Sequence, residues 1–209
     1  MKRIIFCLFV LTAIYFASCA PVKSSADYAV SLIEVESPKD AKIQYGETKV
    51  VNFEEGGIGK YRYEDDYINI VWYVETTKLH FALKNKTPHT LRINWDDISY
   101  VNHLGQVERM VHSGIEWHNK NHPQPPTNIP AGAGIKDILV PINCGAIVPY
   151  VYNTPEDFNA ENGAISYVGK ILKVMMPIMI ENVQNDYVYT FRIDELLNSV
   201  SSRCKIVSE

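Results

Sequence analysis

The sequence predicts a mainly β protein, built as an antiparallel β-sandwich with long loops and a short C-terminal helix. The first observation behind this prediction is that apolar and polar residues alternate in several segments, with the two-residue period of half-buried strands. The second is that these segments are joined by connections too short for the crossovers that parallel strands require. The third is that no helical segments are interleaved between them, which argues against an α/β arrangement.

The clearest pair of predicted strands lies at residues 68–74 and 79–83. Ile68, Ile70 and Trp72 would share one face of the first strand, and polar residues alternate with leucine and phenylalanine in the second. Two such strands with a short connection indicate an antiparallel hairpin.

Other predicted strands flank this hairpin. Gly105 tolerates a positive φ and marks another hairpin turn. Because proline cannot donate to a sheet ladder, the proline-containing residues 119–134 and 143–163 are predicted as long loops. The remaining strands before these loops or between them are expected at residues 30–35, 50–53, 61–63, 91–95, 98–101, 107–111 and 138–140.

The C-terminal region should hold the last hairpin and the helix. Its arms are residues 171–180 and 187–193, and Pro177 predicts an edge position or a bulge for the first arm. Asp194 could cap a short helix that continues to Val200. On the order of nine strands without interleaved helices favour a sandwich, of which the immunoglobulin-like fold is one form, and a closed barrel is the alternative.

The N-terminus has the features of an export leader. Lys2 and Arg3 precede an apolar run over residues 4–17, which is shorter than the ~20 residues that a membrane-spanning helix needs. The motif Phe16-Ala17-Ser18-Cys19 then resembles the lipobox of bacterial lipoproteins, in particular those of the Bacteroidetes. An ordinary secretory signal cut after Ala17 or Ala20, and a short membrane anchor, are the alternatives.

The resemblance implies a signal peptide over residues 1–18, a lipidated Cys19 with a tether over residues 19–27, and a single domain over residues 28–209. Two or more acyl chains give a stable membrane attachment. The implied location is the cell envelope, and Ala20 after the cysteine favours the outer membrane of a Gram-negative bacterium. Residues 79–141 are also loosely similar to β-sandwich lipoproteins of unknown function. This similarity includes no diagnostic motif, so it assigns no site residue.

The net charge and the cysteine content limit which ligands and which disulfides are expected. The formal net charge of −4 argues against non-specific nucleic-acid binding, which depends on neutralising phosphates with Lys and Arg. Once Cys7 has left with the leader and Cys19 is lipidated, Cys144 and Cys204 remain. They could form a disulfide in an oxidising compartment, and two unpaired thiols are the alternative. No cofactor is expected.

Three histidines beside the proline-rich loop are candidate metal ligands. His112, His118 and His122 could bind zinc or copper through neutral imidazoles. The stretch from His118 to His122 is not the H-E-x-x-H motif of zinc proteases, because it lacks the catalytic Glu, and Pro123 follows at once. Solvated loop histidines are therefore the favoured interpretation.

A polar group around Trp95 is a candidate calcium site. Asn94, Asp96 and Asp97 carry oxygen ligands, but a calcium loop usually offers more carboxylates at regular spacing. Polar residues at a strand end are the favoured interpretation, with Trp95 in the core.

Tyrosines supply candidate glycan-binding platforms. Tyr187 and Tyr189 lie on one face of a predicted strand, where core packing is favoured, whereas Tyr150 and Tyr152 lie in a predicted loop and are the stronger ligand-binding candidates.

Three functions are consistent with the sequence. The favoured one is a noncatalytic binding or structural module, tethered to the membrane, that engages a protein or a glycan through its loops. The first alternative is a metal-dependent enzyme or metal-binding protein using the histidines of residues 112–122. The second is an envelope-assembly component that pairs with a partner through an edge strand.

Overall fold

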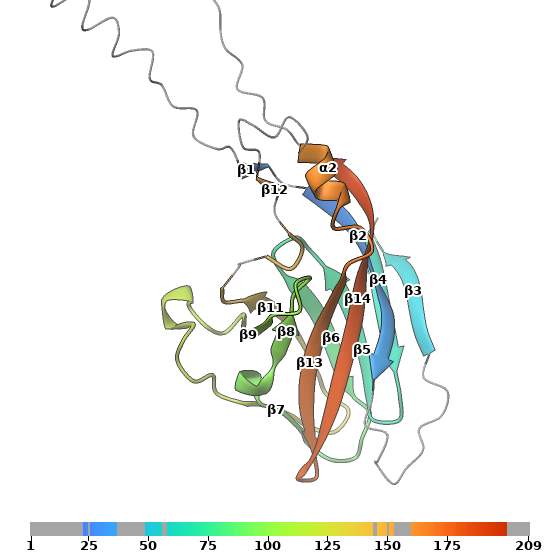
Figure 1. Cartoon of the computed structure of the whole chain (residues 1–209). Helices are drawn as coiled ribbons and strands as arrows, with labels where there is room; N and C mark the ends of the chain where they lie inside the picture. Colours follow the sequence, from blue (N-terminus) through green and yellow to red (C-terminus); the bar gives the residue numbers. More distant parts are fainter. Residues whose placement is uncertain are drawn as a thin grey trace, which may run out of the picture.

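The computed structural model describes residues 23–24, 26–36, 49–55, 58–143, 146–149, 151–152 and 160–199. Most of them form one antiparallel sheet of 12 strands, nearly closed into a barrel-like shape (Figure 1). The strands of this sheet are β2 (Ala26–Glu36), β3 (Lys49–Glu55), β4 (Ile58–Glu64), β5 (Ile68–Val74), β6 (Leu79–Asn85), β7 (Leu91–Ile93), β8 (Ser99–Val101), β9 (Val107–His112), β10 (Thr127–Ile129), β11 (Gly134–Pro141), β13 (Ile171–Ile180) and β14 (Val183–Ser199).

The remaining elements are short. β1 (Lys23–Ser24) pairs with β12 (Val151–Tyr152) in a separate two-stranded sheet. Two single-turn 3-10 helices, η2 (Trp95–Asp97) and η3 (Trp117–Asn119), and one α-helix, α2 (Ala160–Ile165), complete the described chain. None of the described helices has the length and apolar character needed to span a membrane.

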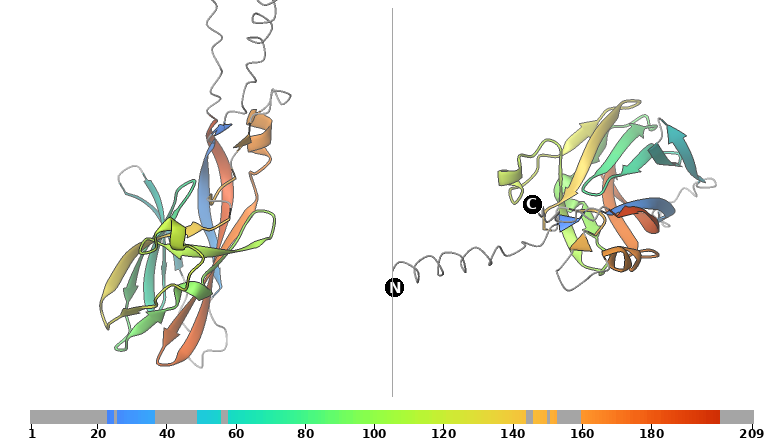
Figure 2. Two further views of the ribbon diagram at one scale, coloured as in Figure 1. Left: turned by 90° about the vertical axis from the view of Figure 1, so that its left-hand side faces the viewer. Right: turned by 90° about the horizontal axis from the view of Figure 1, so that it is seen from above.

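The strands follow one another around the barrel in the order β3, β4, β5, β6, β11, β9, β8, β13, β14 and β2. β2 then lies against β3 and β4, as the view from above shows (Figure 2), but among the described residues no ladder pairs it with them. The predicted mainly β, antiparallel class is confirmed. The predicted immunoglobulin-like sandwich is not confirmed, because the sheet is nearly closed into a barrel-like shape.

The core lies inside the barrel and is rich in aromatic side chains. Alternation along each strand turns one set of residues inwards, as predicted for β5 and β6. The largest fully buried side chains are Trp72, Trp95, Tyr63, Tyr100, Tyr187, Tyr189 and Phe191. Trp72 contacts three other rings, with ring-centroid distances of 4.8 Å to Tyr189, 5.4 Å to Phe81 and 5.8 Å to Phe191.

The predicted edge position of residues 171–180 is wrong. β13 is an interior strand, paired with β14 along one side and with β8 and β7 along the other. Its pairing with β8 ends at Met175 and its pairing with β7 begins at Ile178. Pro177 lies between these two ladders, where the chain that links β7 to β8 turns away, so its missing N–H interrupts neither.

The predicted C-terminal helix is also wrong. β14 continues to Ser199 and pairs with β2 throughout this region, with Leu196 opposite Tyr28. The carboxylate of Asp194, the expected helix cap, accepts a 2.7 Å hydrogen bond from Arg192 Nε. A long-range strand partner therefore overrides the local helical pattern.

Strands also occur in two segments that the sequence predicts to be tether or loop. Paired strands begin before residue 28, because β1 and the first residues of β2 lie in the expected tether. The expected loop over residues 119–134 contains β10, whose three residues fit between Pro126 and Pro130 and pair with β7. The prolines thus flank this short strand and leave its ladder intact.

Candidate functional site

The three predicted metal ligands do not converge. His112 ends β9, and its ring stacks on Trp95 with centroids 4.1 Å apart and planes 9° from parallel. Its Nδ1 lies 3.1 Å from Asp137 Oδ2. His118 and His122 are exposed in the following loop, where His118 Nε2 lies 3.2 Å from a Glu116 carboxylate oxygen. Among the described residues, no group of three or more His, Cys, Asp or Glu could hold a metal ion.

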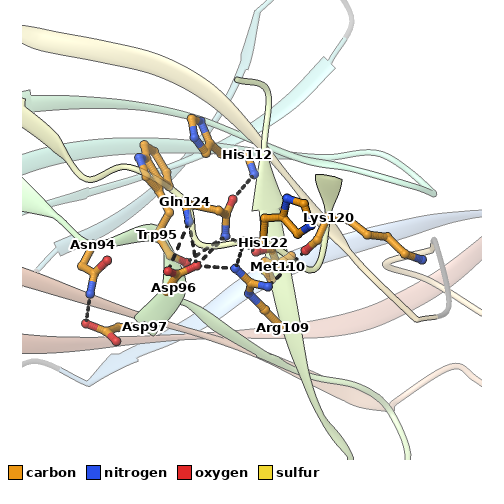
Figure 3. A network of polar contacts seen from close by, with 10 residues as sticks. All are labelled: Asn94, Trp95, Asp96, Asp97, Arg109, Met110, His112, Lys120, His122 and Gln124. Atoms are coloured by element: carbon orange, nitrogen blue, oxygen red, sulfur yellow. Dashed lines mark hydrogen bonds and ion pairs between the residues drawn. The ribbon is translucent and has the colours of Figure 1, made fainter. Parts of the chain in front are cut away.

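The carboxylates beside Trp95 are also separated. Asp97 accepts a 2.6 Å hydrogen bond from Asn94 Nδ2, whereas Asp96 faces Arg109 and Gln124 (Figure 3). Trp95 is buried, as predicted. Asp96 and Asp97 therefore face different partners, and Asp96 belongs to a hydrogen-bonded network.

This network holds the proline-rich loop against β9 and η2. Arg109 forms an ion pair with Asp96 and donates to the carbonyl of His122 at 2.6 Å (Figure 3). Gln124 is buried, donates through Nε2 to the Met110 carbonyl at 2.9 Å and accepts from the backbone N–H of His112 at 3.2 Å. The base of the loop is thus fixed by polar contacts that satisfy the buried Gln124 side chain.

Of the candidate tyrosines and cysteines, two tyrosines lie in the core, and the other residues lie wholly or partly outside the described residues. Tyr187 and Tyr189 are buried, so core packing explains them. Tyr152 pairs with Lys23 through its backbone, and its side chain lies outside the described structure. Tyr150, Cys19, Cys144 and Cys204 lie outside the described residues.

The candidate site is instead on the outer face of the sheet formed by β3, β4, β5, β6 and β11. Two neighbouring hollows there have volumes of about 530 and 450 Å³. Both are lined by Val71, Ala82 and Lys136, so the two hollows adjoin each other and are treated together as one depression. We call this depression the cationic groove.

Strand register explains how the floor of the cationic groove forms. Arg62 lies opposite Val71, Val71 opposite Ala82, and Ala82 opposite Lys136, in one row across four strands. With strands ~4.8 Å apart, the Cα atoms of Arg62 and Lys136 lie roughly 14 Å apart across the strands, with the small apolar side chains of Val71 and Ala82 between them. Gly134 lies two residues before Lys136 and so occupies the neighbouring position of β11 on the same face. A Cβ at this glycine would lie 2.8 Å from the Leu83 carbonyl oxygen.

The acidic side chains around the groove are already engaged. Lys60 Nζ bonds Glu55 at 2.6 Å, and Lys86 Nζ bonds Glu64 at 2.8 Å. These lysine hydrogen bonds hold the pKa of each glutamate below its ordinary value. Glu75 accepts a 2.7 Å hydrogen bond from the Tyr73 hydroxyl, which lowers the pKa of Glu75.

The cations of the groove are less engaged. In the described part of the chain, no carboxylate lies within 4.0 Å of the charged groups of Arg62, Lys84 or Lys136. Arg62 lies over the Phe53 ring, with its guanidinium carbon 5.1 Å from the centroid. A chain with a net charge of −4 thus presents a locally positive surface with an apolar floor.

Two aromatic rings flank this surface. Phe53 and Tyr73 both line the larger hollow, and Tyr73 stacks on His80 with centroids 4.9 Å apart. Burial, together with the nearby Glu75, raises the pKa of Tyr73 to about 12, so its hydroxyl stays protonated at neutral pH. The groove therefore combines cations, apolar surface and rings that hold fixed orientations.

No known protein family matches the chain, and neither curated proteins nor solved structures provide a match.

Proposed function

We propose that the protein is a noncatalytic binding module of the bacterial cell envelope, anchored through a lipid on Cys19, and that the cationic groove binds an anionic glycan. The observation that carries the ligand assignment is the set of three cations around an apolar floor, Arg62, Lys84 and Lys136, which have no carboxylate within 4.0 Å among the described residues. Carboxylate or phosphate groups of a glycan would meet the cations, and its apolar ring faces would meet Val71 and Ala82.

A glycan fits this groove better than an acidic peptide. The row from Arg62 to Lys136 crosses the strands and uses side chains only, whereas a peptide that extends a sheet needs an open strand edge. Among the described strands, the edges of β2 and β3 face each other, and the other edge strand, β10, is only three residues long, which weakens the edge-pairing alternative. The separation of His112, His118 and His122 weakens the metal-dependent alternative.

The ligand assignment is tested by titrating the purified full-length protein with polygalacturonate, neutral dextran and polyglutamate. We expect polygalacturonate to bind and dextran not to bind. Substituting Arg62→Gln, Lys84→Gln and Lys136→Gln together should weaken polygalacturonate binding by roughly threefold to a hundredfold, because each exposed charge contact contributes about 0.2–1 kcal/mol.

The matched control removes the same amount of charge elsewhere on the barrel. Arg92→Gln, Lys173→Gln and Arg192→Gln replace cations on β7, β13 and β14, and should leave binding unchanged. If polyglutamate binds as tightly as polygalacturonate, the groove recognises charge alone and the glycan assignment is wrong. If both triple variants lost the same affinity for polygalacturonate, the groove would not be the binding site.

The lipid anchor has a separate test. Cys19→Ala should leave the precursor uncleaved or release the protein from membranes, and should abolish incorporation of radiolabelled palmitate. A Cys19→Ala protein that matures and fractionates with membranes like the native chain would contradict the anchor.

A further inference from the structure

Exposed apolar side chains gather on two segments that lie side by side. Leu104 and Val107, both 69% exposed, belong to the turn between β8 and β9 and to the start of β9. Ile165, Val168 and Ile171, which are 50%, 38% and 38% exposed, run from the end of α2 to the start of β13. We call these five side chains the apolar end patch.

A ring contact joins the two segments. His103 packs edge-on against Tyr167, with centroids 5.0 Å apart and planes at 84°. The turn that carries Tyr167 is held against β14, because the Gly169 N–H donates to the Ile193 carbonyl at 2.7 Å. Gly169 adopts a φ of 84°, which this turn requires and glycine readily allows. The patch is therefore displayed by two hydrogen-bonded turns.

The apolar end patch lies close to the point where the chain leads back to residue 19. The Tyr28 hydroxyl near the start of β2 donates to the Ala164 carbonyl of α2 at 3.2 Å, and Ala26 packs on Ala164. Tyr167 packs against the same small cluster. Figure 1 shows α2, β1 and β12 together at this end of the barrel.

We infer that the apolar end patch rests on the surface of the bilayer that holds the lipid of Cys19. The inference depends on the proposed anchor. Lys23 in β1 is four residues from Cys19, which limits their separation to roughly 14 Å. The end of the barrel that carries α2 is thereby kept at the membrane, within reach of the interfacial layer that apolar side chains enter.

Charge supports a lipid surface as the occupant of this patch. Lys170 lies between Val168 and Ile171 in sequence and is exposed. A cation among apolar side chains suits a bilayer with anionic headgroups, where the ammonium remains among phosphates while its neighbours enter the interface.

The test places a tryptophan at the patch of the lipid-anchored protein. The full-length chain with Leu104→Trp is reconstituted into vesicles of phosphatidylethanolamine and phosphatidylglycerol that contain brominated acyl chains. The fluorescence added by the new tryptophan should be largely quenched. Val183→Trp is the matched control, because Val183 is 61% exposed at the start of β14, next to the β13–β14 turn at the other end of the barrel. Its added fluorescence should persist.

A second variant tests the apolar character of the patch. Val107→Asp in the Leu104→Trp background should restore the quenched fluorescence, while Val183→Asp should not. Equal quenching at residues 104 and 183, or none at 104 in protein that remains with the vesicles, would overturn the inference and leave the anchor intact. Protein that does not remain with the vesicles would instead contradict the anchor.

Discussion

Asp65 and Tyr187 lie 122 residues apart in the sequence and are joined by a 3.0 Å hydrogen bond in the core. The same carboxylate oxygen accepts a 3.1 Å bond from the Tyr63 hydroxyl, and the other oxygen accepts the N–H groups of Tyr67 and Ile68 at 2.8 and 2.7 Å. One buried carboxylate therefore shapes the turn between β4 and β5 and ties it to β14 across the barrel. Burial, with Asp65 nearby, raises the pKa of the Tyr187 hydroxyl, which stays a donor.

Asp65→Asn should destabilise the fold by about 2–4 kcal/mol, because an amide cannot accept all four hydrogen bonds and leaves buried donors unpaired. Urea unfolding followed by tryptophan fluorescence measures this change. Asp66→Asn is the control, since Asp66 is exposed, and should lie within about 0.5 kcal/mol of the native chain. Equal unfolding midpoints for the two variants would contradict the structural role of Asp65.

Tyr187→Phe should cost about 1 kcal/mol, because it removes one hydroxyl and leaves the ring in place. In a double-mutant cycle with Asp65→Asn, the two changes should be non-additive by at least about 0.5 kcal/mol, as expected for direct partners. Additive effects would show that the 3.0 Å contact contributes no coupling.

Acid should loosen the proline-rich loop through Asp96. Burial pushes the pKa of Asp96 up, but hydrogen bonds from Arg109 and Gln124 outweigh it, and the folded pKa lies below the ordinary value. The stabilisation is therefore present above the unfolded pKa of ~3.9 and is lost as the pH falls through the lower, folded value.

Hydrogen exchange of the amides from His112 to Gln124 reports this loss. Protection in the native chain should fall between pH ~5 and pH ~2 after correction for intrinsic exchange. Asp96→Asn should be poorly protected at every pH, and Asp97→Asn should behave like the native chain, because Asp97 bonds only to Asn94 in the described structure. A pH profile that is unchanged in Asp96→Asn would assign the loosening to another group.

Gly134→Ala should destabilise the fold by more than about 1 kcal/mol, since its Cβ would meet the backbone of β6 at 2.8 Å. Gly59→Ala is the matched control within the same sheet, because its Cβ would lie 3.8 Å from the Tyr61 hydroxyl, an ordinary contact. Thermal unfolding should separate the two variants by several degrees. A Gly134→Ala protein as stable as Gly59→Ala would show that β6 and β11 can move apart at no cost.

Local pattern accounts for much of the fold. Alternation over residues 68–83 correctly predicts β5 and β6, because in a half-buried strand every second residue is apolar and faces the core. Pro177 misleads, since whether a proline interrupts a ladder depends on where the neighbouring strands begin and end. The region after Asp194 misleads for a related reason: its partner, β2, lies more than a hundred residues away.

The cationic groove could not be predicted from the sequence. Arg62, Ala82 and Lys136 each occupy an unremarkable polar-face position of an alternating strand, and only the register of β4, β5, β6 and β11 places them in one row. The three histidines are close in sequence but not in the roles of their side chains. In the structure, His112 packs on Trp95 while His118 points to solvent.

The pairing of β2 with β14 has a consequence for how the chain is made. β2 is the first long strand to leave a ribosome, and the partner that covers its length is the last. Until β14 emerges, the barrel cannot close, so contacts of high sequence separation dominate the final step and folding should be slow. More than 140 residues that follow β2 must therefore be synthesised before β2 acquires its native neighbour.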